Sequence, residues 1–279
     1  MLKQTTIGII GLLFFLGCGG ASNRKQSEAI PIYNQAYQEH YEKDTIKEIL
    51  TLANGAYVLV DPFEKNVTEY IEAIKLNNNQ VAGYISAGTG ENYRDDFSEL
   101  EPYLTTTVWD EWPEEYFISQ ISPEVVNIMK RRIDKMADWG LEWVEFDNMD
   151  WLDNKNQKLY NLKSTPKEAV DYINTLCDYT REKGMKCMAK NSVEGFESFD
   201  GVLYESSLES KNWWDIEGTK SFLKAGKLVI INHYNETDCD EAYEEYKNYY
   251  NNDGISFICE DVQLKKYQHY NQATPSEKK

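Results

Sequence analysis

The sequence contains few histidines, and it has no residue pattern typical of a metal-binding site. Only three histidines occur in 279 residues, His40, His233 and His269, and none lies close to another along the chain. So few imidazoles do not favour a histidine-rich metal centre. The spacings of the cysteines also fit no common zinc-binding pattern. We therefore expect neither a bound metal nor a cofactor.

Positive charge is the second deficit. Lysine and arginine total 29 against 47 aspartates and glutamates, a formal net charge of −18. A chain this acidic is a poor match for nucleic acid, which proteins bind mainly through basic surface. The charge can attract a cationic partner, or it can simply keep the protein soluble, and composition alone does not choose between the two.

Long apolar runs are also absent, apart from a short one at residues 7–16. This run follows Lys3, fits a secretory signal peptide and is too short to span a membrane. It ends in FLGC, which resembles a bacterial lipobox and predicts a signal peptide over residues 1–17 with acylation of Cys18. An ordinary signal peptide containing an unrelated cysteine is the alternative. We expect an exported protein, lipid-anchored to the bacterial cell envelope.

Four cysteines follow the leader, at positions 177, 187, 239 and 259. An exported protein can form disulfides, because the compartments outside the cytosol are oxidising. A bond between Cys239 and Cys259 is one pairing that the spacing allows, but the sequence does not assign it.

Short apolar runs alternate with longer amphipathic segments along most of the chain. The runs have the length of buried strands and cover residues 56–61, 81–87, 116–120, 143–148, 186–191, 201–206, 228–234 and 255–261. Between them, residues 66–77, 122–139 and 165–183 have apolar side chains at helical spacing. Ser122-Pro123 and Thr165-Pro166 are typical helix starts.

Strands that alternate with helices imply parallel strands joined by crossovers. Eight such units predict an α/β fold, a single (β/α)8 TIM barrel, which we place at residues 44–271. A tether and N-terminal extension over 18–43 precede it, and a tail over 272–279 follows. An open doubly wound sheet is the alternative. It is disfavoured because VDPFEKN, after the first predicted strand, has no glycine for a phosphate loop.

Polar residues collect at the carboxyl ends of the predicted strands, where barrel enzymes place their active sites. They are Asp61, Tyr84, Ser86, Asp147, Lys190, Asn191, Tyr204, Glu205, His233, Tyr234, Glu260 and Asp261. The strand bodies are apolar and most strand starts are Gly, Lys, Ala or Val. This asymmetry favours an enzyme, because a purely structural barrel does not need charge at one end.

The stretch VEFDNMDWLD, residues 144–153, carries the densest group of carboxylates. Side chains alternate along a strand, so Glu145 and Asp147 point into the barrel if their apolar neighbours pack against the helices. A deep Glu145 needs a partner, and Lys190 on the next predicted strand is a plausible one. Asp150 lies at the predicted rim of the cleft.

Asp147 and Glu205 are the candidate catalytic pair. Two carboxylates that face each other across a cleft are sufficient for glycoside hydrolysis: one protonates the leaving oxygen and the other attacks or activates water. The competing interpretation of Asp147 is a helix N-cap or loop carboxylate, because aspartate is common where a strand leads into a helix.

The segment SAGTGENYRDDF, after the second predicted strand, is rich in glycine but lacks the lysine and spacing of a nucleotide-binding loop. We expect a flexible wall of the cleft in which Glu91 and Arg94 bind substrate, with a solvated loop as the alternative. The candidates for substrate binding are Asp61, Tyr84, Ser86, Glu91, Arg94, Glu145, Asn148, Asp150, Lys190, Asn191, Tyr234 and Glu260.

Four stretches together carry a family resemblance: VAGYISAGTGENYRDDF, GLEWVEFDNMDWL, KCMAKN and GVLYESS. They resemble successive blocks of glycoside-hydrolase family 114, the endo-α-1,4-polygalactosaminidase-like TIM barrels. The second block is the most specific, because Glu145, Asp147, Asn148 and Asp150 all match in register. The resemblance covers roughly residues 55–261.

The resemblance implies a catalytic pair of Asp147 and Glu205 and a galactosamine-containing α-1,4 polymer as substrate. Such a polymer is cationic when deacetylated, which agrees with the net charge of −18. By analogy with other retaining α-glycosidase barrels, Asp147 is the nucleophile and Glu205 the acid/base. One departure is that Ser206-Ser207 stand where family members often have a cysteine soon after the second carboxylate.

Three other hypotheses compete with an exported glycosidase. The first is a barrel lipoprotein that binds polysaccharide without cleaving it. The second is a structural envelope lipoprotein, which would not need charge at the strand ends. The third is a lyase that uses Lys190 as a Schiff-base amine. We expect a monomer whose partners are an amino-sugar polymer and, through Cys18, the membrane.

Overall fold

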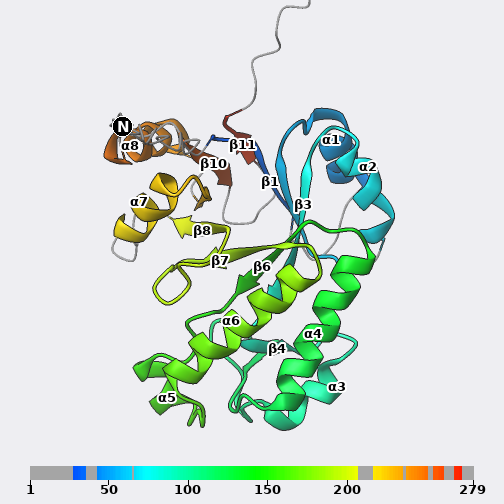
Figure 1. Cartoon of the computed structure of the whole chain (residues 1–279), viewed down its shortest axis with the longest axis vertical. Coiled ribbons are helices and arrows are strands. Elements are labelled where there is room, and N and C mark those ends of the chain that lie inside the picture. The colour runs from blue at the N-terminus through cyan, green and yellow to red at the C-terminus, as the bar shows by residue number, and fades with distance from the viewer. Residues whose placement is uncertain are drawn as a thin grey trace, which may run out of the picture.

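A nine-stranded, mostly parallel sheet forms the centre of the molecule in the computed structural model (Figure 1). The structure describes residues 28–35, 43–64, 66–206, 216–234, 237–250, 254–260 and 267–271. In spatial order, the strands are β1 (Ile32–Gln35), β2 (Tyr57–Val60), β3 (Gln80–Ser86), β6 (Trp143–Asp147), β7 (Lys186–Lys190), β8 (Gly201–Ser206), β9 (Leu228–Tyr234), β10 (Ile255–Glu260) and β11 (Tyr267–His269). Eight strands run parallel, and β11 pairs antiparallel with β10.

The two edges of this sheet meet, so that it curls into a nearly closed barrel. The backbone N–H of Ile30 donates to Oγ of Ser256 at 3.0 Å, joining the segment before β1 to β10. On β11, the ring of His269 stacks on Tyr33 with centroids 4.1 Å apart, and its Nδ1 lies 2.9 Å from the carbonyl oxygen of Ile32. The α/β barrel that the sequence predicts is therefore confirmed.

The barrel strands are not all those that the sequence predicts. Residues 116–120 were expected to form the third strand, but β5 (Glu115–Phe117) pairs antiparallel with β4 (Thr89–Glu91) in a separate two-stranded sheet. The barrel takes its first strand instead from Ile32–Gln35, which we had assigned to the N-terminal extension. The barrel thus begins before residue 44. The barrel therefore loses one predicted strand and gains another, and the number of parallel strands remains eight. The strand that ends at Asp147 is still the fourth.

Helices cover the outside of the barrel, in the order α1 (Lys43–Leu52), α2 (Ile71–Lys75), α3 (Phe97–Leu100), α4 (Pro123–Asp138), α5 (Asn154–Leu159), α6 (Pro166–Glu182), α7 (Ile216–Lys224) and α8 (Cys239–Tyr250). Short 3-10 helices cover Thr68–Tyr70 and Glu101–Tyr103. The long helices α4 and α6 lie side by side (Figure 1). Both begin as predicted: Ser122 caps α4, and Thr165 forms a capping box with Glu168 on α6.

Two apolar cores lie on opposite faces of the sheet. Val144 and Phe146 of β6 are fully buried among the side chains of the surrounding helices. Their neighbour Trp143 packs in the barrel interior, and Glu145, on the same face, is also fully buried. The alternation read from the sequence therefore holds on this strand, and it points a carboxylate into the barrel.

The glycine-rich segment after β3 is not the flexible wall that the sequence predicts. It forms the buried strand β4, held by β5. Glycine is required here by close packing: a Cβ on Gly88 would lie 2.1 Å from the carbonyl oxygen of Asn148, and one on Gly90 would lie 2.5 Å from Leu104. The segment is therefore an ordered wall beside the end of β6.

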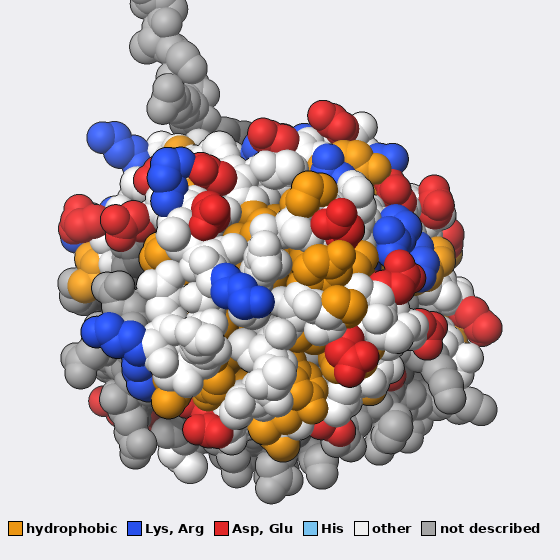
Figure 2. All heavy atoms as spheres, turned by 90° about the horizontal axis from the view of Figure 1, so that it is seen from below, with side chains coloured by type: hydrophobic (Ala, Val, Ile, Leu, Met, Phe, Trp, Pro, Cys, Tyr) orange, Lys and Arg blue, Asp and Glu red, His pale blue; other side chains and the backbone are white. Residues whose placement is uncertain are grey.

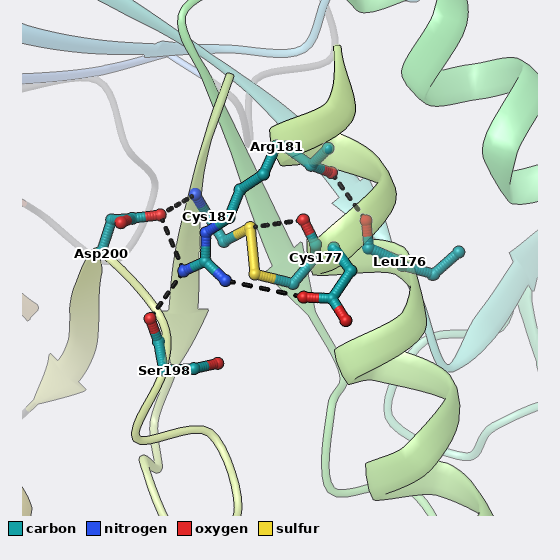
Figure 3. The surroundings of a disulfide bond; sticks show 8 residues. Leu176, Cys177, Arg181, Cys187, Ser198 and Asp200 are labelled. Carbon is teal, nitrogen blue, oxygen red and sulfur yellow. Dashed lines mark hydrogen bonds and ion pairs between the residues drawn. A yellow bond between two sulfur atoms is a disulfide. The ribbon is translucent and has the colours of Figure 1, made fainter. Parts of the chain in front are cut away.

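Two disulfides join helices to strands. Cys177 on α6 bonds to Cys187 on β7, and Cys239 at the start of α8 bonds to Cys259 on β10. Around the first bond, Arg181 of α6 donates to the carbonyl of Ser198 and pairs with Asp200, which also accepts from the backbone N–H of Cys187 (Figure 3). These contacts fix α6 against the edge where β7 and β8 begin.

The leader, Cys18, the first part of the tether and the tail at 272–279 lie outside the described residues. No helix within the described ranges has the length and apolar character needed to cross a membrane. In the view from below, acidic and basic side chains are interspersed with neutral and apolar surface, and this face has no continuous basic stripe (Figure 2).

The bond between Cys177 and Cys187 is expected to stabilise the fold measurably. Replacing both cysteines by alanine should lower the free energy of unfolding by roughly 2–4 kcal/mol, because the unfolded chain loses a covalent constraint. Urea unfolding of the oxidised variant and wild type measures the difference. The same comparison is repeated with both proteins fully reduced. If the variant is then still less stable than wild type by the same amount, the loss comes from side-chain packing and not from the covalent bond.

Candidate active site

The ammonium group of Lys190, the last residue of β7, is the centre of the site. Its Nζ lies 3.4 Å from Oε1 of Glu145, 3.6 Å from Oδ2 of Asp147 and 3.3 Å from Oε1 of Glu205. The Lys190 side chain is 1% exposed. One buried cation therefore brings together three carboxylates that come from β6 and β8.

Glu145 is the deepest of the three, with a fully buried side chain. A charged carboxylate in such a place is costly unless a countercharge compensates it. Lys190 provides this countercharge, as the sequence had led us to expect. Glu145 thus supports the site from below and does not face the solvent.

Asp147 lies higher, with a side chain that is 18% exposed. Its Oδ1 accepts a hydrogen bond from the backbone N–H of Asn148 at 2.8 Å, and Tyr84 donates to it as well. Burial raises the pKa of Asp147 and the charge of Glu205 raises it further, although Lys190 acts in the opposite direction. Asp147 therefore binds a proton more readily than an ordinary aspartate does.

Glu205 is the most exposed of the three, at 27% of its side chain. The hydroxyl of Tyr234 donates to Oε1 at 2.8 Å, and Nδ2 of Asn191 donates to Oε2 at 3.2 Å. Burial alone would raise the pKa of Glu205, but Lys190 and these two donors outweigh burial and hold it below its ordinary value. The site therefore favours an ionised Glu205.

Asparagines directly after β6 and β7 hold the two upper carboxylates. Asn148 and Asn191 have φ angles of +53° and +60°, a left-handed conformation that asparagine tolerates better than most residues. At Asn148, this turn lets the backbone N–H reach Asp147. At Asn191, it directs the side chain to Glu205, and Oδ1 of Asn191 also accepts a hydrogen bond from the backbone N–H of Glu205 at 2.9 Å. Both residues were predicted to bind substrate, and both also position the carboxylate pair.

A second carboxylate network lies beside Asn148. Its Nδ2 donates to Oγ of Ser86 at 2.9 Å and lies 3.5 Å from Oε2 of Glu115. Thr89 links the two, with Oγ1 2.5 Å from both Ser86 Oγ and Glu115 Oε2. Glu115 is not recognisable from the sequence, because its position depends on the tertiary pairing of β5 with β4.

Three other predicted substrate contacts form a separate buried cluster. Arg94 makes a bidentate pair with Asp61, at 2.9 and 2.7 Å, and contacts Glu91 at 2.7 Å. Arg132 of α4 also lies 3.5 Å from Glu91. Asp61, Glu91 and Arg94 are only 4%, 0% and 8% exposed. The prediction that they contact substrate is therefore corrected: they fix the wall formed by β4 against the barrel.

The remaining candidates differ in exposure. Glu260 is buried at the end of β10 and accepts a hydrogen bond from Asn34 at 3.4 Å. Ser86 and Tyr84 are buried too, so they support the site from within. Asp150 is exposed beyond β6, consistent with a place at the rim, and Tyr234 is partly exposed. Asp261 lies outside the described residues.

The chemistry of the site depends on carboxylates and one ammonium group. Within the described ranges, no cluster of histidine, cysteine, aspartate and glutamate is arranged to hold a metal ion. A Schiff-base role for Lys190 is disfavoured, because three surrounding carboxylates outweigh burial and raise the pKa of its ammonium group. A Schiff base requires the neutral amine. The arrangement instead fits acid–base and nucleophilic work by carboxylates.

The sequence profile of glycoside-hydrolase family GH114 matches residues 23–276, nearly the whole chain. The chain belongs to glycoside-hydrolase family GH114. It is therefore a glycosidase with the α/β barrel of that family. No curated protein matches it by sequence.

Solved structures share this fold at low sequence identity. Ega3 of Aspergillus fumigatus, solved in complex with galactosamine, superposes with a TM-score of 0.67 at 20% identity, covering 88% of this chain and 95% of Ega3. The glycoside hydrolase domain of PelA from Pseudomonas aeruginosa gives a TM-score of 0.62 at 11% identity, covering 86% of this chain and 97% of that domain. At such identities the likeness establishes the fold alone.

Removing the central cation should destabilise the protein. Lys190→Met leaves Glu145 without the countercharge that Lys190 provides, so we expect the free energy of unfolding to fall by about 3–5 kcal/mol. Lys186→Met, at the exposed start of the same strand, is the matched control and should change it by less than about 1 kcal/mol. Adding Glu145→Gln to Lys190→Met should recover part of the loss. No recovery in urea unfolding would contradict the pairing.

Glu260 should make the stability depend on pH. Burial, together with the charge of Glu205, raises the pKa of Glu260 to about 8, although Asn232 and Asn34 donate to it. In the unfolded chain a glutamate has a pKa of about 4.3. Between this pKa and that of the folded state, unfolding releases a proton from Glu260, so the free energy of unfolding falls as the pH rises. Glu260→Gln mimics the protonated form. It should lessen the fall in melting temperature between about pH 5 and pH 8, and equal slopes for wild type and variant would contradict this.

Proposed function

We propose that the protein is an exported glycosidase that hydrolyses an α-1,4-linked, galactosamine-containing polysaccharide, with Asp147 and Glu205 as its carboxylate pair. The observation that carries the proposal is the meeting of these two side chains at Lys190, at the carboxyl ends of β6 and β8. Both are partly exposed, whereas Glu145 beneath them is buried. The galactosamine in the Ega3 structure and the acidic composition of this chain support an amino-sugar substrate.

The geometry limits the distance between the pair. Asp147 Oδ2 and Glu205 Oε1 contact the same Nζ, at 3.6 and 3.3 Å, so these oxygens cannot be further apart than the sum of those distances. That limit, about 7 Å for this pair of oxygens, accommodates the separation of about 5–5.5 Å between carboxyl groups found in retaining enzymes, whereas inverting enzymes have about 6.5–9.5 Å. We therefore propose a retaining mechanism.

In this mechanism Asp147 attacks the anomeric carbon while Glu205 protonates the leaving oxygen, and Glu205 then deprotonates the water that releases the sugar. The positions of the two residues on the fourth and sixth strands support these roles. The surroundings of the two carboxylates favour the opposite distribution of the proton, because they raise the pKa of Asp147 and lower that of Glu205. The assignment therefore requires the proton to pass to Glu205 when the glycoside enters.

We also propose that acylation of Cys18 anchors the protein to the cell envelope. β1 is parallel to its neighbour, so the chain enters the barrel at the end where the strands start. There, Glu28 and Ile30 line a pocket together with Gln80, Trp143 and Lys186. An anchor on the preceding segment would join the barrel at the end opposite Lys190. The proposed catalytic mouth would then not be occluded by the attachment point.

Cleavage and roles can be tested on the soluble domain. We expect wild type to shorten α-1,4-galactosamine oligomers, detected by mass spectrometry of the products. Asp147→Asn and Glu205→Gln should each lose at least about 10²–10⁴-fold in rate. A barrel that only binds would give no products with either wild type or variants.

Azide separates the two roles, because it can replace the missing nucleophile or react without base assistance. With an aryl α-galactosaminide, Asp147→Ala plus azide should yield the glycosyl azide of inverted configuration. Glu205→Ala plus azide should yield the azide of retained configuration. The reverse result, read from the anomeric NMR signals, would exchange the two assignments.

A further inference from the structure

Glu115 is a carboxylate that lies beside the proposed catalytic pair. Lys190 contacts three site carboxylates, and Arg94 contacts two more. By contrast, no lysine, arginine or histidine among the described residues forms an ion pair with Glu115. Within the described part of the chain the carboxylate is therefore not paired at short range, although the charge of Arg94 acts on it from further away.

The position of Glu115 is fixed from outside the barrel. It lies on β5, opposite Glu91 of β4. Its Oε2 accepts from Thr89 at 2.5 Å and lies 3.5 Å from Nδ2 of Asn148. The backbone of the same Asn148 donates to Asp147 at 2.8 Å. Asn148 therefore contacts both Glu115 and the proposed nucleophile, which places Glu115 next to the proposed cleavage point.

The surroundings of Glu115 make a bound cation favourable. Burial, together with the nearby charges of Glu91 and Asp147, raises the pKa of Glu115 to about 7, although the hydrogen bond from Thr89 and the charge of Arg94 act in the opposite direction. A ligand with a positive charge would reverse the repulsion and stabilise the ionised form. A neutral ligand would not.

Two exposed aromatic residues come from the chain segments next to Glu115. Tyr93 and Trp112, which are 51% and 58% exposed, are the only aromatic side chains among the exposed large hydrophobic residues of the described chain. Trp112 accepts a backbone hydrogen bond from Glu115 at 2.9 Å, and Tyr93 follows β4 by two residues, beside β5. Aromatic faces suit the apolar faces of sugar rings. A carboxylate on the same wall as two exposed aromatic residues has the chemistry to recognise an amino sugar.

We propose that Glu115 binds the ammonium group of a deacetylated hexosamine unit beside the cleavage point, and so selects deacetylated over N-acetylated chains. This inference rests on the proposed function and deepens it. An acetamide has no charge for Glu115 to pair with, and it brings a larger group against the carboxylate. Trp112 and Tyr93 contribute contact with the ring, which does not depend on acetylation.

The test compares kcat/KM for matched deacetylated and N-acetylated α-1,4-galactosamine oligomers. Glu115→Gln keeps an oxygen that accepts from Thr89 but removes the charge. It should lower kcat/KM for the deacetylated oligomer by about 10- to 100-fold and leave the acetylated oligomer nearly unchanged. Glu114→Gln, the exposed neighbouring carboxylate, is the matched control and should leave both values unchanged. Trp112→Ala should lower both values by similar factors.

Calorimetric binding of the same oligomers to Asp147→Asn, with and without Glu115→Gln, separates this inference from the proposed reaction. If wild type cleaves but Glu115→Gln keeps the wild-type preference, Glu115 is not the selecting group and the proposed function stands. If nothing is cleaved but Glu115→Gln weakens only binding of the deacetylated oligomer, the assignment stands without the hydrolysis. An absence of both cleavage and binding would overturn the two together.

Discussion

The ammonium group of Lys190 lies within 3.6 Å of oxygens from Glu145, Asp147 and Glu205, in a place where almost no solvent reaches. One positive charge cannot neutralise three negative ones. The remaining imbalance explains why the three carboxylates differ: Glu145 is buried and paired, Glu205 is held ionised by donors, and Asp147 retains a proton more readily. The chemistry available to the site follows from this unequal sharing of one cation.

The candidate site is built from two different structural units. The barrel supplies the proposed catalytic pair and the asparagines that orient it, since both asparagines follow a strand in a left-handed turn. The small sheet of β4 and β5 supplies Glu115, and exposed aromatic residues lie in the segments next to this sheet. This division agrees with a general property of barrel enzymes, in which strand ends carry the reaction and the added loops set the specificity.

The acidic composition has more than one structural origin. Some carboxylates are neutralised inside the protein, as Asp61 and Glu91 are by Arg94. Others, such as Glu115 and Glu260, are partly or fully buried without a full countercharge, and their pKa values are raised to about 7 and about 8. At pH 7 Glu260 is therefore mostly protonated and Glu115 about half ionised, so the formal net charge of −18 overstates the charge of the folded protein. A cationic polymer bound beside Glu115 would favour its ionised form.

The sequence by itself determined the barrel class and the alternation along β6, because hydrophobic periodicity is a local property of the chain. It also identified the strand ends that carry Asp147, Lys190 and Glu205. It did not find β1, whose four residues become a strand only by pairing with β2. Nor did it place β5 outside the barrel, or assign the two disulfides. Those features, the burial of Arg94 with its partners and the position of Glu115 were decided by tertiary structure, because each depends on contacts between segments far apart in the chain.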